Sequence, residues 1–109
     1  MIRIVYHRKY HRVTVEGHAR SGELGRDLVC SAVSALTYTL ATSVTNLFKD
    51  DRKKMREVKT NLERGKAEIS CNPVQGFSAV VTLVFDTICT GYDILAVDYP
   101  EYISFEIRE

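Results

Sequence analysis

A histidine and a cysteine stand twelve positions apart in the segment EGHARSGELGRDLVCSAVSAL, which covers residues 16–36. His18 follows a predicted strand, and Cys30 comes near the start of a predicted helix. An imidazole beside a thiol can accept its proton, and the resulting thiolate is a strong nucleophile stabilised by the imidazolium. If the fold brings the two side chains together, the pair could attack a carbonyl and form a thioester.

The start of the predicted helix adds to this chemistry. Asp27 is expected to cap the helix, because an aspartate at that position accepts hydrogen bonds from free backbone N–H groups. Cys30 would then lie in the first turn, where those N–H groups and the helix dipole favour a thiolate and could bind an oxyanion. Asp27 could instead orient His18. Ser34, one turn after Cys30, could form a hydrogen bond within the site or simply allow close packing.

The same residues also have a purely structural interpretation. A single cysteine on a helix is most often a small buried hydrophobe, and His18 could be an ordinary loop residue. Cys30 lies about one position off the apolar stripe of the predicted helix. Its flank of the helix is small and partly polar, with Ser34, Thr37 and Ala41. This flank favours an exposed or interfacial thiol, but the residue pattern alone leaves both interpretations open.

The elements that must position the pair follow from periodicity. Alternating apolar residues predict strands over 1–6, 13–17, 56–62, 67–71 and 103–108. Helical spacing predicts a helix from residue 28 to about 47 and a second one over 77–95, although the β-branched residues of 79–85 also allow a strand there. The order β-β-α-β-β-α-β predicts an α+β fold with two layers, in which two helices pack on one mostly antiparallel sheet.

Composition limits the class of protein. The chain has 109 residues, 45% of them hydrophobic, which predicts a single domain over residues 1–109. Its net charge of +1 argues against a protein that wraps nucleic acid. The three cysteines, Cys30, Cys71 and Cys89, are odd in number and lack CxxC spacing, so no disulfide scaffold is expected. Cys71 and Cys89 are expected to be inert core residues.

The sequence also indicates where the protein is expected to be located and whether it is expected to bind a metal. The chain shows no basic-then-apolar leader, and its longest apolar run, residues 80–85, is far shorter than a membrane span. We therefore expect a cytoplasmic protein with no membrane contact. His7 and His11 have the i, i+4 spacing of a zinc pair, but they fall in a predicted strand turn, where solvated side chains are the better interpretation. No metal or cofactor is expected.

The motif around the pair resembles a known family. "GHA" followed by "GRDLVCSAVSAL" is similar to the signature of the ribosomal-processing cysteine protease family, Prp. Members of that family carry Gly-His-Ala, a glycine-containing loop, and then Asp-(Ile/Leu)-Val-Cys with Ser-Ala-Leu on the same helix. The agreement runs from Gly17 to Leu36, and the length and the predicted elements are compatible over the rest of the chain.

The resemblance implies an endopeptidase in which Cys30 is the nucleophile and His18 is the general base and acid. Its substrate would be the N-terminal extension of the large-subunit ribosomal protein L twenty-seven, and the protein would be a homodimer. Gly17, which matches the family glycine, would let substrate backbone approach closely. The loop containing Gly22 and Gly25 would close over the substrate as a lid.

Two other classes compete with the protease interpretation. The first is a non-catalytic ribosome- or RNA-associated small protein that uses the charged segment KDDRKKMR, residues 49–56, and its RNA binding would depend strongly on salt. The second is a redox-sensing thiol protein. That class needs a resolving cysteine near Cys30, and none is close in sequence.

Overall fold

The computed structural model describes residues 1–17, 24–51 and 53–109, without the side chains of residues 24–27. Its elements are β1 (Ile2–His7), the 3-10 turn η1 (Arg8–Tyr10), β2 (Arg12–Glu16), α1 (Leu24–Asp50), β3 (Met55–Glu63), β4 (Lys66–Pro73), the 3-10 turn η2 (Gln75–Phe77), α2 (Ser78–Asp98) and β5 (Ile103–Arg108). The order of strands and α-helices is the predicted one, and the predicted α+β fold is confirmed.

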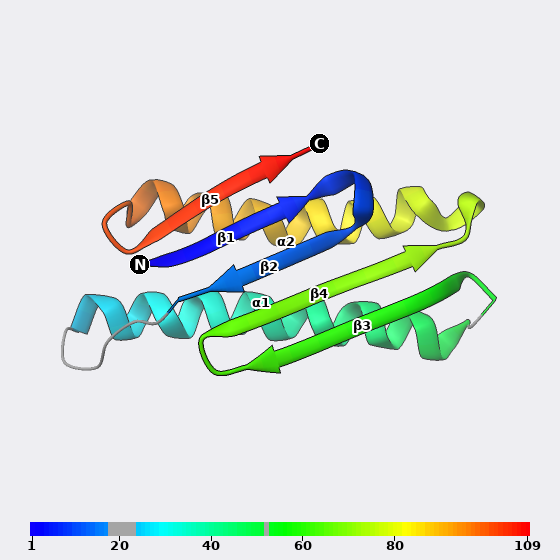
Figure 1. Cartoon of the computed structure of the whole chain (residues 1–109), viewed down its shortest axis with the longest axis horizontal. Helices are drawn as coiled ribbons and strands as arrows, with labels where there is room; N and C mark the ends of the chain where they lie inside the picture. The colour runs from blue at the N-terminus through cyan, green and yellow to red at the C-terminus, as the bar shows by residue number, and fades with distance from the viewer. Residues whose placement is uncertain (18–23, 52) are drawn as a thin grey trace.

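The five strands form one sheet in the order β3-β4-β2-β1-β5. Every neighbouring pair is antiparallel except β1 and β5, which run parallel with Ile2 opposite Ile103. Both helices cover the same face of this sheet and run in opposite directions (Figure 1). The domain therefore has the two layers, one sheet and one pair of helices, that the sequence predicts.

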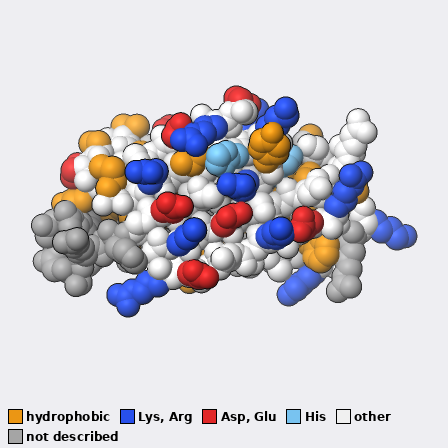
Figure 2. Space-filling view, in the orientation of Figure 1, with side chains coloured by type: hydrophobic (Ala, Val, Ile, Leu, Met, Phe, Trp, Pro, Cys, Tyr) orange, Lys and Arg blue, Asp and Glu red, His pale blue; other side chains and the backbone are white. Residues whose placement is uncertain are grey.

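The period-two pattern of the strands separates a buried sheet face from a solvated one. The solvated face carries Lys, Arg, Asp and Glu side chains interspersed across its width (Figure 2). Several are paired along or between strands: Arg12 with Glu68 at 3.8 Å, Lys59 with Glu57 at 3.4 Å, and Arg108 with Glu106 at 2.8 Å. Among the described residues, the two charge signs are therefore mixed on this face.

Helix α2 settles the ambiguity at residues 79–85 in favour of a helix. Its buried residues, Val81, Phe85, Cys89 and Tyr92, recur every three or four positions and face the sheet. Burial of this stripe outweighs the modest cost of placing β-branched residues in a helix. The core between the layers is completed by the buried faces of α1 and of the strands.

Helix α1 begins earlier than the sequence predicts. It starts at Leu24, so Asp27 lies within the first turn and is not the N-cap, and Gly25 is a helical residue and not part of a loop. An acidic residue is favourable in the first turn of a helix as well as at the cap. The residue type alone therefore could not distinguish these two positions.

Both helices are long and apolar. By length and composition alone, residues 28–50 and 75–98 would be able to cross a membrane, a property that a search for unbroken apolar runs misses. Helices that cover the core of a water-soluble domain meet the same criterion. Here each helix buries one side against the sheet and leaves the other uncovered.

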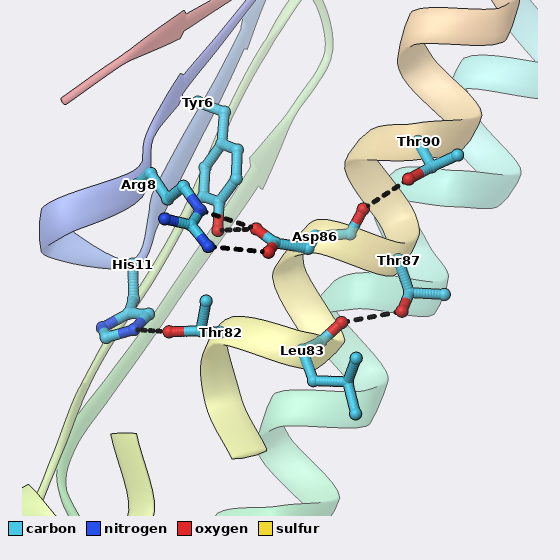
Figure 3. A network of polar contacts seen from close by, with 8 residues as sticks. All are labelled: Tyr6, Arg8, His11, Thr82, Leu83, Asp86, Thr87 and Thr90. Carbon is cyan, nitrogen blue, oxygen red and sulfur yellow. Dashed lines mark hydrogen bonds and ion pairs between the residues drawn. The ribbon is translucent and has the colours of Figure 1, made fainter. Parts of the chain in front are cut away.

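A polar network links the β1–β2 connection to α2 (Figure 3). Asp86 accepts a hydrogen bond from the Tyr6 hydroxyl at 2.8 Å and two from the Arg8 guanidinium at 3.1 Å. His11 is buried, adopts a left-handed backbone conformation with φ of 49°, and bonds through Nε2 to the Thr82 hydroxyl at 2.8 Å. The prediction of a solvated turn was therefore wrong for His11, because α2 packs over this turn.

The described residues contain no group of three or more His, Cys, Asp or Glu side chains placed to hold a metal ion.

Candidate active site

A cleft of about 430 Å³ opens between α1 and the turn of the β3–β4 hairpin. Helix α1 lines it with Cys30, Val33, Ser34, Thr37 and Tyr38. The sheet contributes Ile2, Val15 and Gly17, and the hairpin contributes residues 62–67. Apolar and polar groups contribute about equally to its lining, and Glu63, Arg64 and Lys66 supply the charged side chains.

Cys30 is half-buried and packs against the core from the helix side of this cleft. Its spacing to Ser34, Thr37 and Tyr38 is that of a single helix face, which explains why all four line the cleft. At 1.5 Å per residue, Tyr38 lies about 12 Å along the axis from the thiol. An extended peptide of about four residues would span that length.

Gly17 closes the opposite side of the cleft. Its φ of 116° is a conformation that favours glycine, and a Cβ there would overlap the Met1 carbonyl oxygen. Its N–H donates to the Gly65 carbonyl at 2.9 Å, which ties the end of β2 to the hairpin turn. The chain's own backbone therefore requires a glycine here, a reason separate from the predicted approach of substrate.

The other predicted site residues lie partly outside the described structure. His18, the residue after Gly17, and Gly22 lie outside the described residues. Gly25 and Asp27 belong to the first turn of α1, and their side chains are not described. The structure thus brings Gly17, Cys30 and Ser34 to one cleft.

The position of Cys30 within α1 corrects one part of the predicted chemistry. Cys30 is the seventh residue of the helix and lies in its second turn. It is about 9 Å along the axis from the first residue at 1.5 Å per residue. The free N–H groups belong to the first turn, and the dipole effect fades beyond it. The N-terminus of α1 therefore stabilises the Cys30 thiolate less than the sequence predicts.

A buried hydrogen bond joins the two helices beneath the cleft. The Thr37 hydroxyl donates to the Val33 carbonyl at 2.7 Å, and it lies 2.8 Å from the hydroxyl of Tyr92. Because the Thr37 proton is used, Tyr92 is the donor in the second bond. Tyr92 is fully buried, and burial raises the pKa of its hydroxyl. This pair fixes the cleft-lining part of α1 against α2.

The two other cysteines are buried, as predicted. Burial raises the pKa of the Cys71 and Cys89 thiols to about 12 in each case. A thiol with such a pKa is protonated at neutral pH and reacts slowly. Neither is suited to act as the resolving thiol that the redox-sensor interpretation requires.

Sequence reasoning missed the hairpin wall of the cleft. Residues 62–67 were predicted only as two strand ends around a turn, and Gly65 does occupy that turn with φ of 79°. Their contact with the cleft arises because β4 pairs with β2 and carries the turn to the side of α1. Local periodicity contains no signal for such a contact between distant segments.

A half-buried cysteine on a helix, facing a peptide-sized cleft in a two-layer α+β domain, is an arrangement suited to a thiol-dependent hydrolase. The comparisons with known proteins agree. The family model described as cysteine protease Prp matches residues 1–104, and the chain belongs to this family. It is accordingly a cysteine protease. The comparison with curated proteins gives no match.

Solved structures share the fold. SMU.848 from Streptococcus mutans is 25% identical with a TM-score of 0.67, over 97% of this chain and 90% of that one. The essential ribosomal processing protease Prp from S. aureus, in complex with a substrate peptide, is 20% identical with a TM-score of 0.71 over 98% of this chain and 97% of its own. The same S. aureus protease with a covalently linked product peptide gives 20% and 0.70 over the same shares.

Proposed function

We propose that this protease is an endopeptidase that removes the N-terminal extension of the large-subunit ribosomal protein L twenty-seven. In this proposal Cys30 is the nucleophile and His18 is the general base and acid. The observation that carries the proposal is the position of Cys30 in a cleft whose other side ends at Gly17, the residue that precedes His18. The family match and the similarity to the ribosomal processing protease of S. aureus support the substrate class.

The reaction needs few groups. His18 accepts the Cys30 proton, and the thiolate attacks the scissile carbonyl to form a tetrahedral intermediate. The C–N bond then breaks, and protonated His18 donates its proton to the leaving amine. Water, deprotonated by His18, hydrolyses the thioester and returns the thiol. Because Cys30 lies in the second turn of α1, the imidazolium contributes more to stabilising the thiolate than the helix dipole does.

Asp27 and Ser34 have supporting roles in this proposal. Asp27 precedes Cys30 by one helical turn, so the remaining functional role for it is to orient His18. A carboxylate there would oppose thiolate formation unless His18 carries the compensating positive charge. Ser34 is exposed to the cleft that it lines one turn after Cys30, where its hydroxyl can bond to substrate. The lid stays a prediction for Gly22, while Gly25 belongs to the helix.

The cleft has the size of a short peptide segment, which supports an extended substrate chain as its occupant. We further propose that the protein is a cytoplasmic homodimer. The free cysteines are compatible with a reducing compartment, since none of the three is paired in the structure.

Two substitutions test the catalytic proposal. Cys30→Ala and His18→Ala should each abolish cleavage of a peptide that spans the ribosomal protein's extension, with cleavage read from fragment masses. Both variants should keep the native circular dichroism spectrum. Ser31→Ala is the matched control, because Ser31 is exposed next to Cys30 but does not line the cleft, and it should leave cleavage unchanged. Full activity of Cys30→Ala would refute the mechanism.

Alkylation provides a second readout that does not require the substrate. Iodoacetamide at neutral pH should modify Cys30 rapidly, and the buried Cys71 and Cys89 should stay unmodified in the folded protein. His18→Ala should slow the modification of Cys30, because the imidazolium no longer stabilises the thiolate. Equal rates with and without His18 would contradict its role as the base.

A further inference from the structure

A second cavity, of about 550 Å³, lies between α2 and β5 and shares no lining residue with the cleft beside α1. Its lining is mostly apolar. Cys89 and Phe105 contribute to it together with Ile107, whose side chain is 52% exposed. Two carboxylates, those of Asp86 and Asp93, also line it. An apolar cavity with a few charged groups is the usual form of a binding site.

The two carboxylates of this cavity differ in their partners. Asp86 is bound to Tyr6 and Arg8 within the domain, as the close view shows (Figure 3). Asp93 is exposed and has no hydrogen-bond or ion-pair partner among the residues that the structure describes. The cavity therefore presents an unpaired carboxylate beside an apolar wall. This combination suits a lysine or arginine of a partner, because such a side chain packs its methylene stem on apolar groups and keeps its charge at a polar end.

The cavity adjoins the open edge of β5. This strand is the last in the sheet order, and among the described residues it pairs only with β1 (Figure 1). The Tyr102 carbonyl accepts a hydrogen bond from the N–H of Ile2 at 2.8 Å, so it points toward β1. Because successive strand residues direct their backbone groups to alternate sides, the N–H and C=O groups of Phe105 and Ile107 point to the open edge. The side chains of the same two residues line the cavity. A strand added at this edge would therefore bond to β5 and place side chains beside the cavity.

The other edge strand, β3, is less suited to accept a strand. Its pairing with β4 is irregular between Met55 and Glu57, and Lys59 lies on it with an exposed side chain. Bulges and lysines are common means by which proteins block an open sheet edge. Strand β5 contains no lysine and pairs with β1 in regular register from Ile103 to Arg108. Of the two edges, β5 is thus the one open to pairing.

The charges of the chain are unevenly divided, and the acidic part includes this edge. Residues 86–109, which contain β5 and most of α2, carry six acidic side chains and one basic one. That basic residue, Arg108, is already paired with Glu106 at 2.8 Å. Residues 1–85 carry eight acidic and fourteen basic side chains. A positively charged partner is therefore favoured at the β5 edge, whereas nucleic acid is repelled there.

We propose that the open edge of β5 and the adjoining cavity form an exosite, which binds a basic, extended segment of the ribosomal protein substrate outside the part that is cleaved. We call it the β5 exosite, and it consists of Asp93, Phe105 and Ile107. The segment adds as a further strand beside β5, and one of its lysine or arginine side chains pairs with Asp93. The proposal rests on the proposed function, because proteins that bind RNA contact phosphates through lysine and arginine, and a ribosomal protein therefore offers such segments before it is assembled.

Comparison of two substrates tests the charge contact. One substrate is the full-length ribosomal protein L twenty-seven with its extension, and the other is a short peptide that spans only the extension and the cleavage site. Asp93→Lys should raise KM for the full-length protein about fivefold or more and leave kcat unchanged, because attraction to the basic segment becomes repulsion. The same variant should cleave the short peptide as the wild type does. Asp98→Lys is the matched control, since Asp98 is an exposed aspartate of α2 that does not line the cavity.

The backbone contact has its own test. Ile107→Pro removes the outward N–H of residue 107 and breaks no bond to β1, whereas Ile107→Ala keeps this N–H and shortens the side chain. Ile107→Pro should therefore raise KM for the full-length protein more than Ile107→Ala does. In amide hydrogen exchange, the N–H groups of Phe105 and Ile107 should become protected when full-length substrate binds to the inactive Cys30→Ala variant, and the short peptide should not protect them.

The outcomes separate the exosite from the proposed function. If the wild type cleaves neither substrate, the proposed function is refuted, and the exosite with it. If it cleaves both, and Asp93→Lys and Asp98→Lys have equal effects on the full-length protein, the exosite alone is refuted. Protection of Phe105 and Ile107 that rises with enzyme concentration in the absence of substrate would assign the edge to another copy of the chain, and this too would refute the exosite.

Discussion

Replacing the two hydroxyls beneath the cleft should reveal how tightly α1 is held to α2. Thr37→Val keeps the shape of the side chain but removes the hydroxyl that accepts a hydrogen bond from Tyr92. Tyr92→Phe removes the donor of the same bond. Because both residues are buried and belong to different helices, the pair is suited to a double-mutant cycle.

The two single changes should differ in cost. Thr37→Val leaves the fully buried Tyr92 hydroxyl without a partner, which costs about 1–3 kcal/mol. Tyr92→Phe leaves the Thr37 hydroxyl donating to Val33, so it should cost about 1 kcal/mol. The double variant contains neither hydroxyl, and its stability should resemble that of Tyr92→Phe. The magnitude of the coupling energy should then equal the cost of Thr37→Val, about 1–3 kcal/mol.

Urea unfolding followed by circular dichroism measures all four corners of this cycle. In thermal unfolding, each kcal/mol corresponds to about 4 °C for a domain of this size. If the double variant were less stable than the wild type by the sum of the two single losses, the hydroxyls would not interact. Thr37→Val should also reduce cleavage more than Tyr92→Phe does, because Thr37 lines the cleft and Tyr92 does not.

Two further predictions concern the turns that frame the sheet. Gly17→Ala should destabilise the fold by about 1–3 kcal/mol because of the positive φ of Gly17, and the overlap of the new Cβ with Met1 should add to this cost. Gly76→Ala is the control, because Gly76 has open space around it. This variant should have neutral or slightly increased stability in the same unfolding assay. Burial lowers the pKa of His11 below 6.5, so the unfolded chain binds the proton more readily, and stability should fall as pH drops through the unfolded value. His11→Asn should flatten this part of the stability–pH curve. A slope unchanged by that substitution would contradict the assignment.

Periodicity was sufficient to predict the order of elements and the two layers. Strand β4 alternates between buried apolar and more exposed polar positions, and its apolar residues face the core under the helices. The start of α1 could not be predicted, because Asp27 suits the first turn as well as the cap. Because the predicted helix began too late, Cys30 was expected in the first helical turn, whereas it lies in the second.

Long-range contacts explain the other differences. The motif from Gly17 to Leu36 identified one side of the cleft, whereas the hairpin wall depends on the pairing of β4 with β2. His11 was predicted as solvated because its local sequence is polar. Its burial results from packing against α2, a helix far along the chain, where Thr82 shares a hydrogen bond with the imidazole. No local pattern contains that information.

The parallel pairing of β1 with β5 has a consequence for synthesis of the chain. Ile2 can pair with Ile103 only after residue 103 has been translated. At a translation rate of about 5–20 residues per second, this edge of β1 stays unpaired for several seconds. During that interval the sheet lacks β5, and the face of α2 that packs against β5 stays uncovered. Strand β5 can therefore join the sheet only after residues 103–108 have been synthesised, and a nascent chain stalled before residue 103 would expose a pairing edge to chaperones or to other unfinished chains.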